Sequence, residues 1–274
     1  MFFERILRWW GHRGGVDNLT TFAFENILYD ETTVQIGEGT HGTVYKIQYN
    51  GKVAVLKVLK PEGSLESFRQ EVDQLLHLAG AGGSPVILAK TKFSFRLDRR
   101  TEDVKPIAFV ASFCGDANLW DLLCEQRLKD EDLFRISVGI VEKMCEVAER
   151  GVVHNDLKSD NIIVSFENGF PEVHVIDFGM GCLNGVNQHL DQVLVDNDPE
   201  VLDWMDPSVL AGGESTLSAD VYSVGVMLAE IGAKMTNRPS GLLQVVKAAL
   251  QQNAIDRPTM HSISQTLKAM SIPT

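Results

Sequence analysis

The 274-residue sequence changes its hydrophobic pattern once, near Gly115, and this change most constrains the fold. Before it, short apolar runs typical of strands predominate, within 26–60, 86–95 and 107–112. After it, the pattern is mostly helical, with brief strand-like segments near 152, 162–165 and 173–176. A β-rich part followed by a helix-rich part predicts an α+β protein with two lobes.

The first part contains clear local signals. Asn50-Gly51 lies between apolar-rich runs, which predicts a hairpin because a type I′ turn needs two positive φ angles. Ser64 can cap a helix with one apolar face, and the glycine-rich run 80–85 ends it. Residues 1–25 form a lead-in segment, expected either to pack as a short helix on the protein or to dock a partner or a membrane surface.

Three glycines, Gly37, Gly39 and Gly42, match the pattern G-x-G-x-x-G. Glycine lets backbone N–H groups approach phosphate oxygens because no Cβ intervenes. The same spacing opens a helix in dinucleotide-binding folds, but here 43–45 continue as a strand, which favours a flap between two strands. Taken alone, the pattern is weak, since a turn with three glycines is the simpler interpretation.

Lys57 closes an apolar run and can reach nucleotide phosphates if an anionic side chain holds it. Glu71, in the helix predicted after Ser64, is such a side chain. Taken singly, an exposed strand-end lysine and a surface glutamate remain the simpler interpretation.

The most specific pattern is the run His154-Asn155-Asp156-Leu157-Lys158-Ser159-Asp160-Asn161, followed by Ile176-Asp177-Phe178-Gly179. Asp156 can orient an attacking hydroxyl and accept its proton, and Lys158 can stabilise charge on a transferred phosphoryl group. Asn161 and Asp177 offer the hard oxygen ligands that Mg²⁺ prefers.

In this order, the motifs resemble those of the eukaryotic-type protein kinase family over about residues 26–272. Two later runs agree. The run 218–225 resembles the family's central helix, with Asp220 supporting the catalytic-loop backbone, and 256–259 resembles its late Arg-Pro motif. The resemblance implies a bilobal fold with an N-lobe at 26–112, a hinge at 113–116 and a C-lobe at 117–272. The compact, divergent sequence also resembles kinases of large DNA viruses.

The resemblance implies transfer of the γ-phosphoryl group of ATP to a protein hydroxyl, with ATP and Mg²⁺ required. Lys158 is the residue typical of serine/threonine kinases. Asp156 and Lys158 would be catalytic, and Asn161 and Asp177 would bind the metal ion. The implied ATP-binding residues are Ile36, Gly37, Gly39, Gly42, Val44, Ala54, Lys57, Glu71 and Ile163.

The sequence departs from the family at three places. Asn155 replaces an arginine, and 179–205 contain no Ser, Thr or Tyr, so we expect activity without activation-loop phosphorylation. Asp206-Pro207-Ser208 replaces Ala-Pro-Glu, so either Arg257 finds another acid or the substrate shelf is looser. Val201 replaces a threonine whose hydroxyl would link Asp156 and Lys158, which weakens the serine/threonine assignment.

Two other functions stay open, a pseudokinase scaffold and a small-molecule kinase on the same fold. The scaffold is disfavoured because such proteins usually lose at least one of Lys57, Glu71, Asp156, Asn161 and Asp177, all present here. Small-molecule kinases rarely carry the complete glycine loop, the Asp-Phe-Gly run and the late Arg-Pro motif together.

The net charge of 25 − 37 = −12 argues against a binder of nucleic acid or of anionic membranes. Six acids and no Lys or Arg lie between Met180 and Asp206, so we expect protein substrates with basic flanks. No C-x-x-C pair and no membrane-length apolar run occur, which favours an intracellular protein, cytoplasmic or nuclear, or in the host cell if viral.

Overall fold

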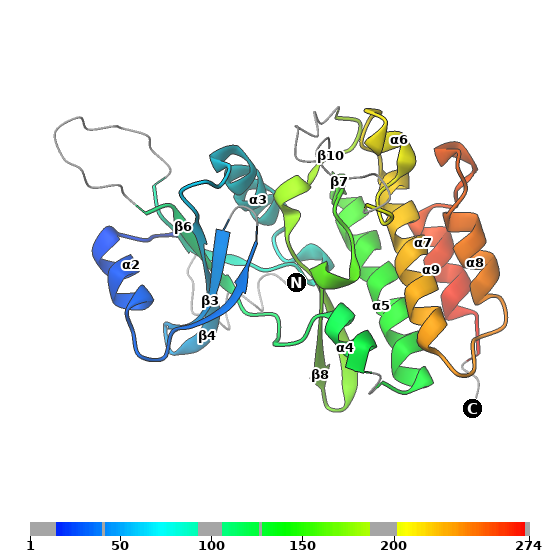
Figure 1. Cartoon of the computed structure of the whole chain (residues 1–274), viewed down its shortest axis with the longest axis horizontal. Coiled ribbons are helices and arrows are strands. Elements are labelled where there is room, and N and C mark those ends of the chain that lie inside the picture. The colour runs from blue at the N-terminus through cyan, green and yellow to red at the C-terminus, as the bar shows by residue number, and fades with distance from the viewer. Residues whose placement is uncertain (1–14, 40–41, 93–105, 126–127, 187–201, 272–274) are drawn as a thin grey trace. The chain divides into compact units, whose positions relative to one another are not determined.

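The computed structural model describes residues 15–39, 42–92, 106–125, 128–186 and 202–271 (Figure 1). The chain divides into two compact units, residues 1–80 with 85–113 and residues 81–84 with 114–274. The first is built around a six-stranded sheet and the second is mostly helical. This confirms the α+β class, with a β-rich N-terminal part and a helical C-terminal part.

The sheet of the first unit has the strand order β1-β5-β6-β4-β3-β2. β1 pairs with β5 in parallel, and every other neighbouring pair is antiparallel. The strands are β1 (Asp17–Asn18), β2 (Val34–Glu38), β3 (Gly42–Tyr49), β4 (Lys52–Leu59), β5 (Ile87–Lys90) and β6 (Ala108–Ser112). The predicted hairpin joins β3 to β4, where Asn50 and Gly51 both have positive φ, 50° and 74°.

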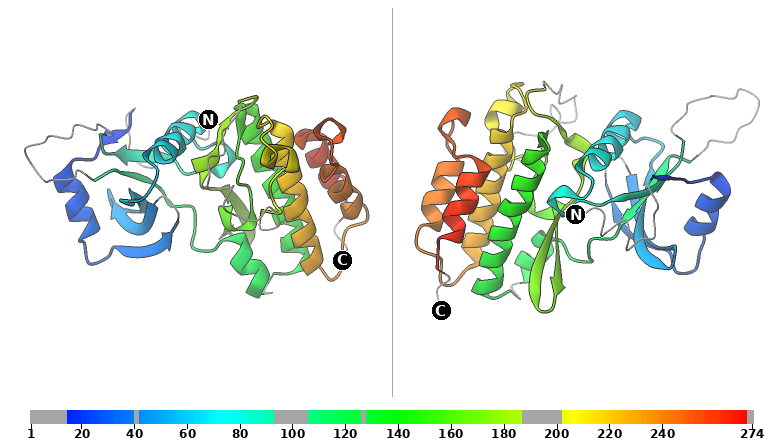
Figure 2. Two further views of the ribbon diagram at one scale, coloured as in Figure 1. Left: turned by 45° about the horizontal axis from the view of Figure 1, so that its top comes forward. Right: turned by 180° about the vertical axis from the view of Figure 1, so that it is seen from behind.

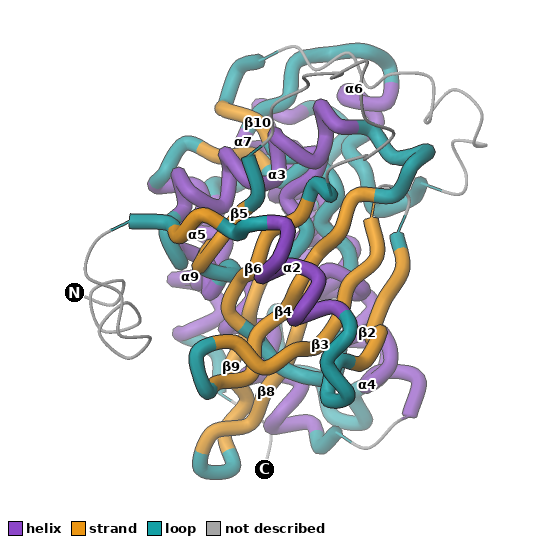
Figure 3. The backbone as a smooth tube through the Cα atoms, turned by 90° about the vertical axis from the view of Figure 1, so that its left-hand side faces the viewer, coloured by secondary structure: helices purple, strands orange, loops and turns teal. Residues whose placement is uncertain are grey.

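Two helices cover opposite faces of this sheet. α2 (Thr21–Leu28) lies across the strands in Figure 3, and its Phe24 belongs to a buried cluster with sheet residues such as Ile47. α3 (Leu65–Leu78) packs on the other face, where Phe68 contacts Phe109 with 5.2 Å between ring centroids. Residues 17–25 therefore belong to the first unit, and the predicted end of the lead-in at residue 25 falls within α2.

The helices of the second unit pack side by side, with α9 against α5 and α8 against α7 (Figure 2). They are α4 (Leu119–Glu125), α5 (Asp130–Glu149), α6 (Pro207–Leu210), α7 (Leu217–Lys234), α8 (Leu242–Ala249) and α9 (Met260–Lys268). Its short strands are β7 (Val152–Val153), β8 (Ile162–Glu167), β9 (Phe170–Val175) and β10 (Cys182–Leu183), and its 3-10 turns are η1 (Ala81–Gly83), η2 (Ser159–Asn161), η3 (Phe178–Met180) and η5 (Ala254–Asp256). β7 pairs with β10, and β8 with β9. None of the helices in the described ranges combines the length and the apolar character needed to cross a bilayer.

The glycine-rich run after α3 does more than end that helix. A Cβ on Gly82 would lie 2.5 Å from the Val147 side chain of α5, and one on Gly83 would lie 2.7 Å from the Val173 carbonyl oxygen of β9. Both glycines also have positive φ. Only glycine lets η1 approach α5 and β9 this closely.

Candidate active site

The three glycines of the predicted flap lie where β2 turns into β3. The Gly39 N–H donates to the Gly42 carbonyl oxygen over 2.9 Å, and a strand rather than a helix follows. Packing requires glycine at Gly42, where a Cβ would lie 2.9 Å from the Val58 carbonyl oxygen. At Gly37 and Gly39 a Cβ would meet nothing closer than 3.8 Å and 3.9 Å. There the absence of a side chain fits the close approach of phosphate oxygens, since neighbouring atoms do not demand it.

Lys57 and Glu71 form a largely buried ion pair in the first unit. The Lys57 Nζ of β4 lies 2.7 Å from each carboxylate oxygen of Glu71 on α3. The two side chains are only 15% and 7% exposed, so water and salt screen the pair weakly. The Ser64 hydroxyl accepts the Ser67 N–H and caps α3, as the sequence predicted. The pair thus fixes the Lys57 ammonium group, which can bind a phosphate oxygen.

Ala54 and Lys57 lie on the same strand, β4, but their side chains point to opposite faces of the sheet. Successive side chains of a strand point to opposite faces, and Ala54 is fully buried, opposite Ile47, in the cluster that includes α2. Val44, the cross-strand partner of Lys57, shares the Lys57 face, and so does Val55. Ala54 therefore faces away from Lys57, which counts against the predicted contact of Ala54 with ATP, and Val55 lies on the Lys57 face instead. The run before Lys57 is uniformly apolar, so it carries no signal of which residues share a face.

The predicted catalytic loop, His154–Asn161, follows β7 in the second unit and is held by Asp220 of α7. The Asp220 carboxylate accepts the backbone N–H groups of His154 over 2.8 Å and of Asn155 over 3.2 Å. Burial raises the pKa of the Asp220 carboxyl, and its interactions with His154 and Asn155 oppose that shift. The His154 ring packs on the Phe178 ring, and its Nε2 lies 2.9 Å from the Ile176 carbonyl oxygen. The loop is thus tied both to α7 and to the segment after β9.

Polar side chains converge on Asp156 in this loop. The Asn161 Nδ2 donates to the Asp156 carbonyl oxygen over 2.7 Å and to its Oδ2 over 3.1 Å. The Lys158 Nζ lies 3.5 Å from the same Oδ2. The Trp204 Nε1 donates to the other oxygen, Oδ1, over 2.9 Å. The structure therefore brings together three predicted residues and Trp204, a residue outside every motif that the sequence indicated.

Asn161 and Asp177 come from adjoining segments, since the Ile176 N–H donates to the Asn161 carbonyl oxygen over 3.0 Å. Asp177 has φ 62° and ψ 68°, a left-handed conformation that is uncommon outside glycine. Because the Asn161 amide nitrogen is engaged with Asp156, its amide oxygen is the group that can bind a metal ion.

This donor set fits Mg²⁺. In the part of the chain that the structure describes, no three His, Cys, Asp or Glu side chains gather into a metal cage. Mg²⁺ does not need one, because it is commonly held by one or two protein oxygen ligands and takes the rest from substrate phosphates and water. Asn161 and Asp177 can supply the protein share.

Asn155 ties the catalytic loop to the segment that begins with Asp177. Its Nδ2 donates to the Met180 carbonyl oxygen over 3.0 Å and to the Cys182 Sγ over 3.3 Å. Its φ is 63°, and asparagine tolerates this left-handed region better than most residues do. A neutral amide therefore links this loop directly to the start of the predicted activation segment, residues 179–205.

Asp206 is the acid that pairs with Arg257. The ion pair joins Arg257 Nη1 to Asp206 Oδ2 and is fully enclosed. Burial alone would raise the pKa of the Asp206 carboxyl, but hydrogen bonds from Arg257 and Ser208 outweigh it, and the pKa is lowered. Of the two alternatives that the sequence left open, the structure supports the first.

The last two predicted residues lie on different units, Ile36 exposed on β2 and Ile163 half-buried on β8.

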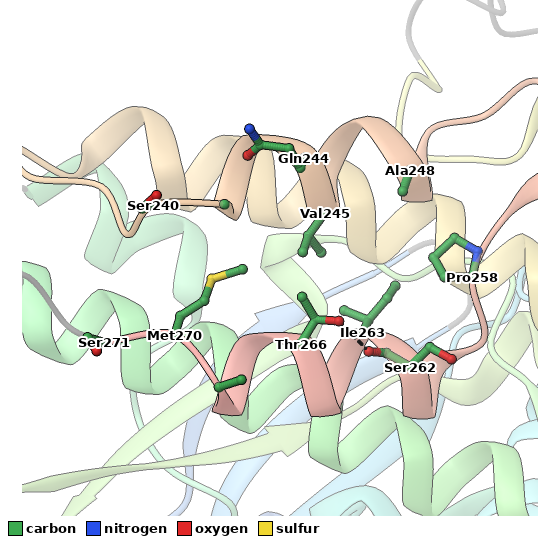
Figure 4. Close-up of a pocket in the computed structure, with 12 residues that line it drawn as sticks. Ser240, Gln244, Val245, Ala248, Pro258, Ser262, Ile263, Thr266, Met270 and Ser271 are labelled. Atoms are coloured by element: carbon green, nitrogen blue, oxygen red, sulfur yellow. Dashed lines mark hydrogen bonds between the residues drawn. The ribbon is translucent and has the colours of Figure 1, made fainter.

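A groove of about 590 Å³ lies between α8 and α9, where Val245, Ile263 and Met270 face one another (Figure 4). It is lined by none of the predicted residues. Groove volume therefore does not identify the candidate site here.

Comparison with known sequences identifies one family model and several relatives that match this chain. The family model described as protein kinase domain matches residues 31–270. A probable serine/threonine-protein kinase of Dictyostelium discoideum is 26% identical over 205 residues, covering 72% of this chain and 20% of that protein. The RGS domain-containing serine/threonine-protein kinase A of the same organism is 24% identical over 297 residues, covering 94% and 24%.

A third relative is the serine/threonine-protein kinase STY46 of Arabidopsis thaliana, 25% identical over 201 residues, covering 72% of this chain and 32% of that protein. The chain thus spans a third or less of the length of these three relatives. The matched region includes the glycine loop, the Lys57–Glu71 pair and the catalytic loop around Asp156. The chain belongs to the protein kinase domain family.

Proposed function

We propose that the chain is an ATP- and Mg²⁺-dependent protein kinase that acts on serine or threonine hydroxyls. The observation that carries the proposal is the environment of the Asp156 carboxylate, which Asn161, Lys158 and Trp204 orient within a loop anchored on Asp220. Its side chain is 17% exposed, so an acceptor hydroxyl can reach it. The serine/threonine relatives and Lys158 favour these acceptors.

In the proposed reaction, the acceptor oxygen forms a bond to the γ-phosphorus of ATP, and the bond from that phosphorus to the β–γ bridging oxygen breaks. Asp156 takes the hydroxyl proton, and Lys158 stabilises the negative charge of the transferred group. Asn161 and Asp177 would hold Mg²⁺, which would neutralise phosphate charge. The protein contributes mainly position and electrostatics.

The first unit provides the proposed phosphate and base contacts. Lys57, held by Glu71, binds the α- and β-phosphates, and the backbone of the glycine loop covers them. We expect Ile36 and Val44 of this unit to contact the adenine, while Ile163 remains the ATP-binding residue predicted in the second unit. Val55 is the further candidate for this contact, because it shares a face with Val44 and Lys57.

We further propose that activity does not depend on phosphorylation of the activation segment. The link from Asn155 to Met180 supports this, because a neutral amide makes it without a phosphate group. Residues 179–205 also contain no hydroxyl side chain that could be phosphorylated.

The preference for basic flanks is supported by the excess of acids in one part of the sequence. Segment 180–206 carries six acids and no Lys or Arg, although four of these acids lie outside the described residues and Asp206 is paired with Arg257. Burial raises the pKa of the Glu230 carboxyl, a hydrogen bond from Ser159 opposes this shift, and the nearby acids Asp203 and Asp160 add to it, so the pKa is raised. Within the described residues the buried Glu230 Oε2 has no hydrogen-bond partner. A Lys or Arg of a substrate would relieve this clustering of negative charge.

The test is phosphoryl transfer by the purified chain with ATP and Mg²⁺, offered protein, peptide and small-molecule acceptors. We expect transfer to Ser or Thr of proteins, faster for peptides with basic flanks, and unchanged after treatment of the enzyme with a phosphatase. Asp177→Asn should abolish transfer, whereas Asp73→Asn, the same change at an exposed position of α3, should not.

Three results would contradict the proposal. ATP binding without transfer to any acceptor would indicate a scaffold. Transfer to small molecules alone would indicate the other kinase class. Loss of activity after phosphatase treatment would contradict phosphorylation-independent activity.

A further inference from the structure

Trp204 makes two contacts with the catalytic loop that no family motif assigns to it. Its Nε1 donates to Asp156 Oδ1 over 2.9 Å. The Lys158 Nζ lies 4.5 Å from the centroid of the Trp204 ring, within the range of a cation–π interaction. One side chain therefore contacts both residues proposed to carry the chemistry.

These contacts involve the same two residues that a threonine hydroxyl would link if position 201 carried one. Val201 has no hydroxyl and lies outside the described residues. A hydrogen bond and a ring contact from Trp204 can perform both tasks. A lysine ammonium group binds to an indole face by electrostatic attraction, and the indole N–H is a hydrogen-bond donor only, which matches a carboxylate acceptor.

The hydrogen bond leaves room for a substrate on Asp156. A carboxylate has about four lone-pair sites, two on each oxygen. Asn161 and Lys158 approach Oδ2, whereas Trp204 alone donates to Oδ1 among the contacts described. One lone pair of Oδ1 is then still available to an acceptor hydroxyl, so Trp204 can stay in place during transfer.

The segment around Trp204 is held in place by buried neighbours and hydrogen bonds. Leu202 and Met205 on either side are buried, 7% and 3% exposed, and the Met205 N–H donates to the Leu202 carbonyl oxygen over 3.0 Å. Asp206, which follows, is fixed by Arg257. A half-buried indole carried on such a turn is held in one orientation, as a positioning residue must be.

We propose that Trp204 is a positioning residue that holds Asp156 and Lys158 for phosphoryl transfer. This inference rests on the proposed function, because positioning matters only if the loop transfers phosphate. It predicts that the N–H and the ring contribute separately, the N–H through Asp156 and the ring through Lys158.

The test compares Trp204→Phe, which removes the N–H and keeps an aromatic ring, with Trp204→Leu, which removes both. We expect Trp204→Phe to lower kcat by about 10- to 100-fold, as for loss of one hydrogen bond to a charged group, while the KM for ATP changes less than about twofold. Trp204→Leu should lower kcat further. Trp120→Phe, the same change at a 49% exposed position on α4, serves as the matched control and should keep wild-type kcat.

A double-mutant cycle separates positioning from a merely structural role. If Trp204 acts through Asp156, Trp204→Phe should have little further effect in the Asp156→Asn background. An equal loss in both backgrounds, a proportional rise in the KM for ATP, or wild-type kcat in Trp204→Phe would each overturn the inference.

A second measurement does not depend on activity. The chain has four tryptophans, so its ¹H–¹⁵N spectrum should show four indole signals, and the one missing from Trp204→Phe belongs to Trp204. That signal should move upfield in Asp156→Ala, because the acceptor is gone. If it does not move, the contact is absent and the inference fails. If it moves but the wild-type chain transfers phosphate to no acceptor, the proposed function fails and the positioning role fails with it.

Discussion

Arg257 and Asp206 form an ion pair in which both side chains are almost completely enclosed, 0% and 1% exposed. The remaining donors of Arg257 bind the carbonyl oxygens of Gln251, Gln252 and Ser218. The pair thus ties the residue that begins the Asp-Pro-Ser run to the start of α7 and to the segment before α9. It makes the connection that the family's glutamate, replaced here by Ser208, would otherwise make.

Asp206→Ala should lower the free energy of unfolding by about 3 kcal/mol, because removing one partner leaves the Arg257 charge buried without compensation. Urea unfolding measures the change. Ser208→Ala, which removes only a hydroxyl that donates to Asp206, should cost about 1 kcal/mol. Adding Ser208→Glu to Asp206→Ala should recover part of the loss by returning the acid to the family's position. A small loss in Asp206→Ala would mean that the carbonyl oxygens alone satisfy Arg257.

The same pair predicts a pH dependence. The pKa of Asp206 is lowered in the folded protein from its ordinary value of 3.8, so in acid the unfolded chain binds a proton first. Stability from this group is therefore fully present above about pH 4 and is lost as the pH falls through the lower folded pKa. The difference in unfolding free energy between the wild type and Asp206→Asn should be constant above that pH and shrink below it. A difference that stays constant down to pH 2 would contradict the assignment.

The Lys57–Glu71 pair predicts a graded loss of phosphoryl transfer. Glu71→Gln keeps a hydrogen-bond acceptor but removes the charge that fixes Lys57, so we expect kcat/KM to fall by about 10-fold. Lys57→Ala should abolish most transfer, because the phosphate contact itself is lost. Glu66→Gln, the same change at an exposed position of α3, is the control. Steady-state kinetics with a protein acceptor check this, and full activity in Lys57→Ala would contradict the role given to Lys57.

Much of the fold could be predicted because its signals are local. The Asn50-Gly51 hairpin needs only two residues that accept positive φ, and the cap at Ser64 needs only one hydroxyl beside the helix start. The catalytic loop was predictable for the same reason, since Asp156, Lys158 and Asn161 lie within six positions of one another.

The rest depends on contacts between distant segments. Ala54 points to the face of the sheet that α2 covers. Because the strand is uniformly apolar, its sequence does not indicate which side chains point to that face. Trp204 reaches Asp156 across 48 positions, and Arg257 reaches Asp206 across 51, so neither spacing forms a recognisable motif. The departure at Ser208 left open whether Arg257 pairs with another acid, and it did not indicate which one. The departure at Val201 indicated only that a hydroxyl link to Asp156 and Lys158 is lost.

Asn155 offers a test of how the chain holds its activation segment. Asn155→Gly keeps the freedom to adopt φ 63° and removes the amide that donates to Met180, so it should lose about 1 kcal/mol of stability for the hydrogen bond. Asn155→Ala removes the same amide but keeps a Cβ in a left-handed conformation, so it should be less stable than Asn155→Gly by about 1 kcal/mol. Urea unfolding of both variants measures the order.

Both variants should also transfer phosphate more slowly than the wild type, because the link from the catalytic loop to the start of the activation segment is gone. His261→Ala, at an exposed position on α9, is the control substitution and should transfer phosphate at the wild-type rate. If Asn155→Ala were as stable as Asn155→Gly, the backbone at this position would not hold the left-handed conformation. If both kept wild-type rates, the amide link would not be what replaces a phosphate in this chain.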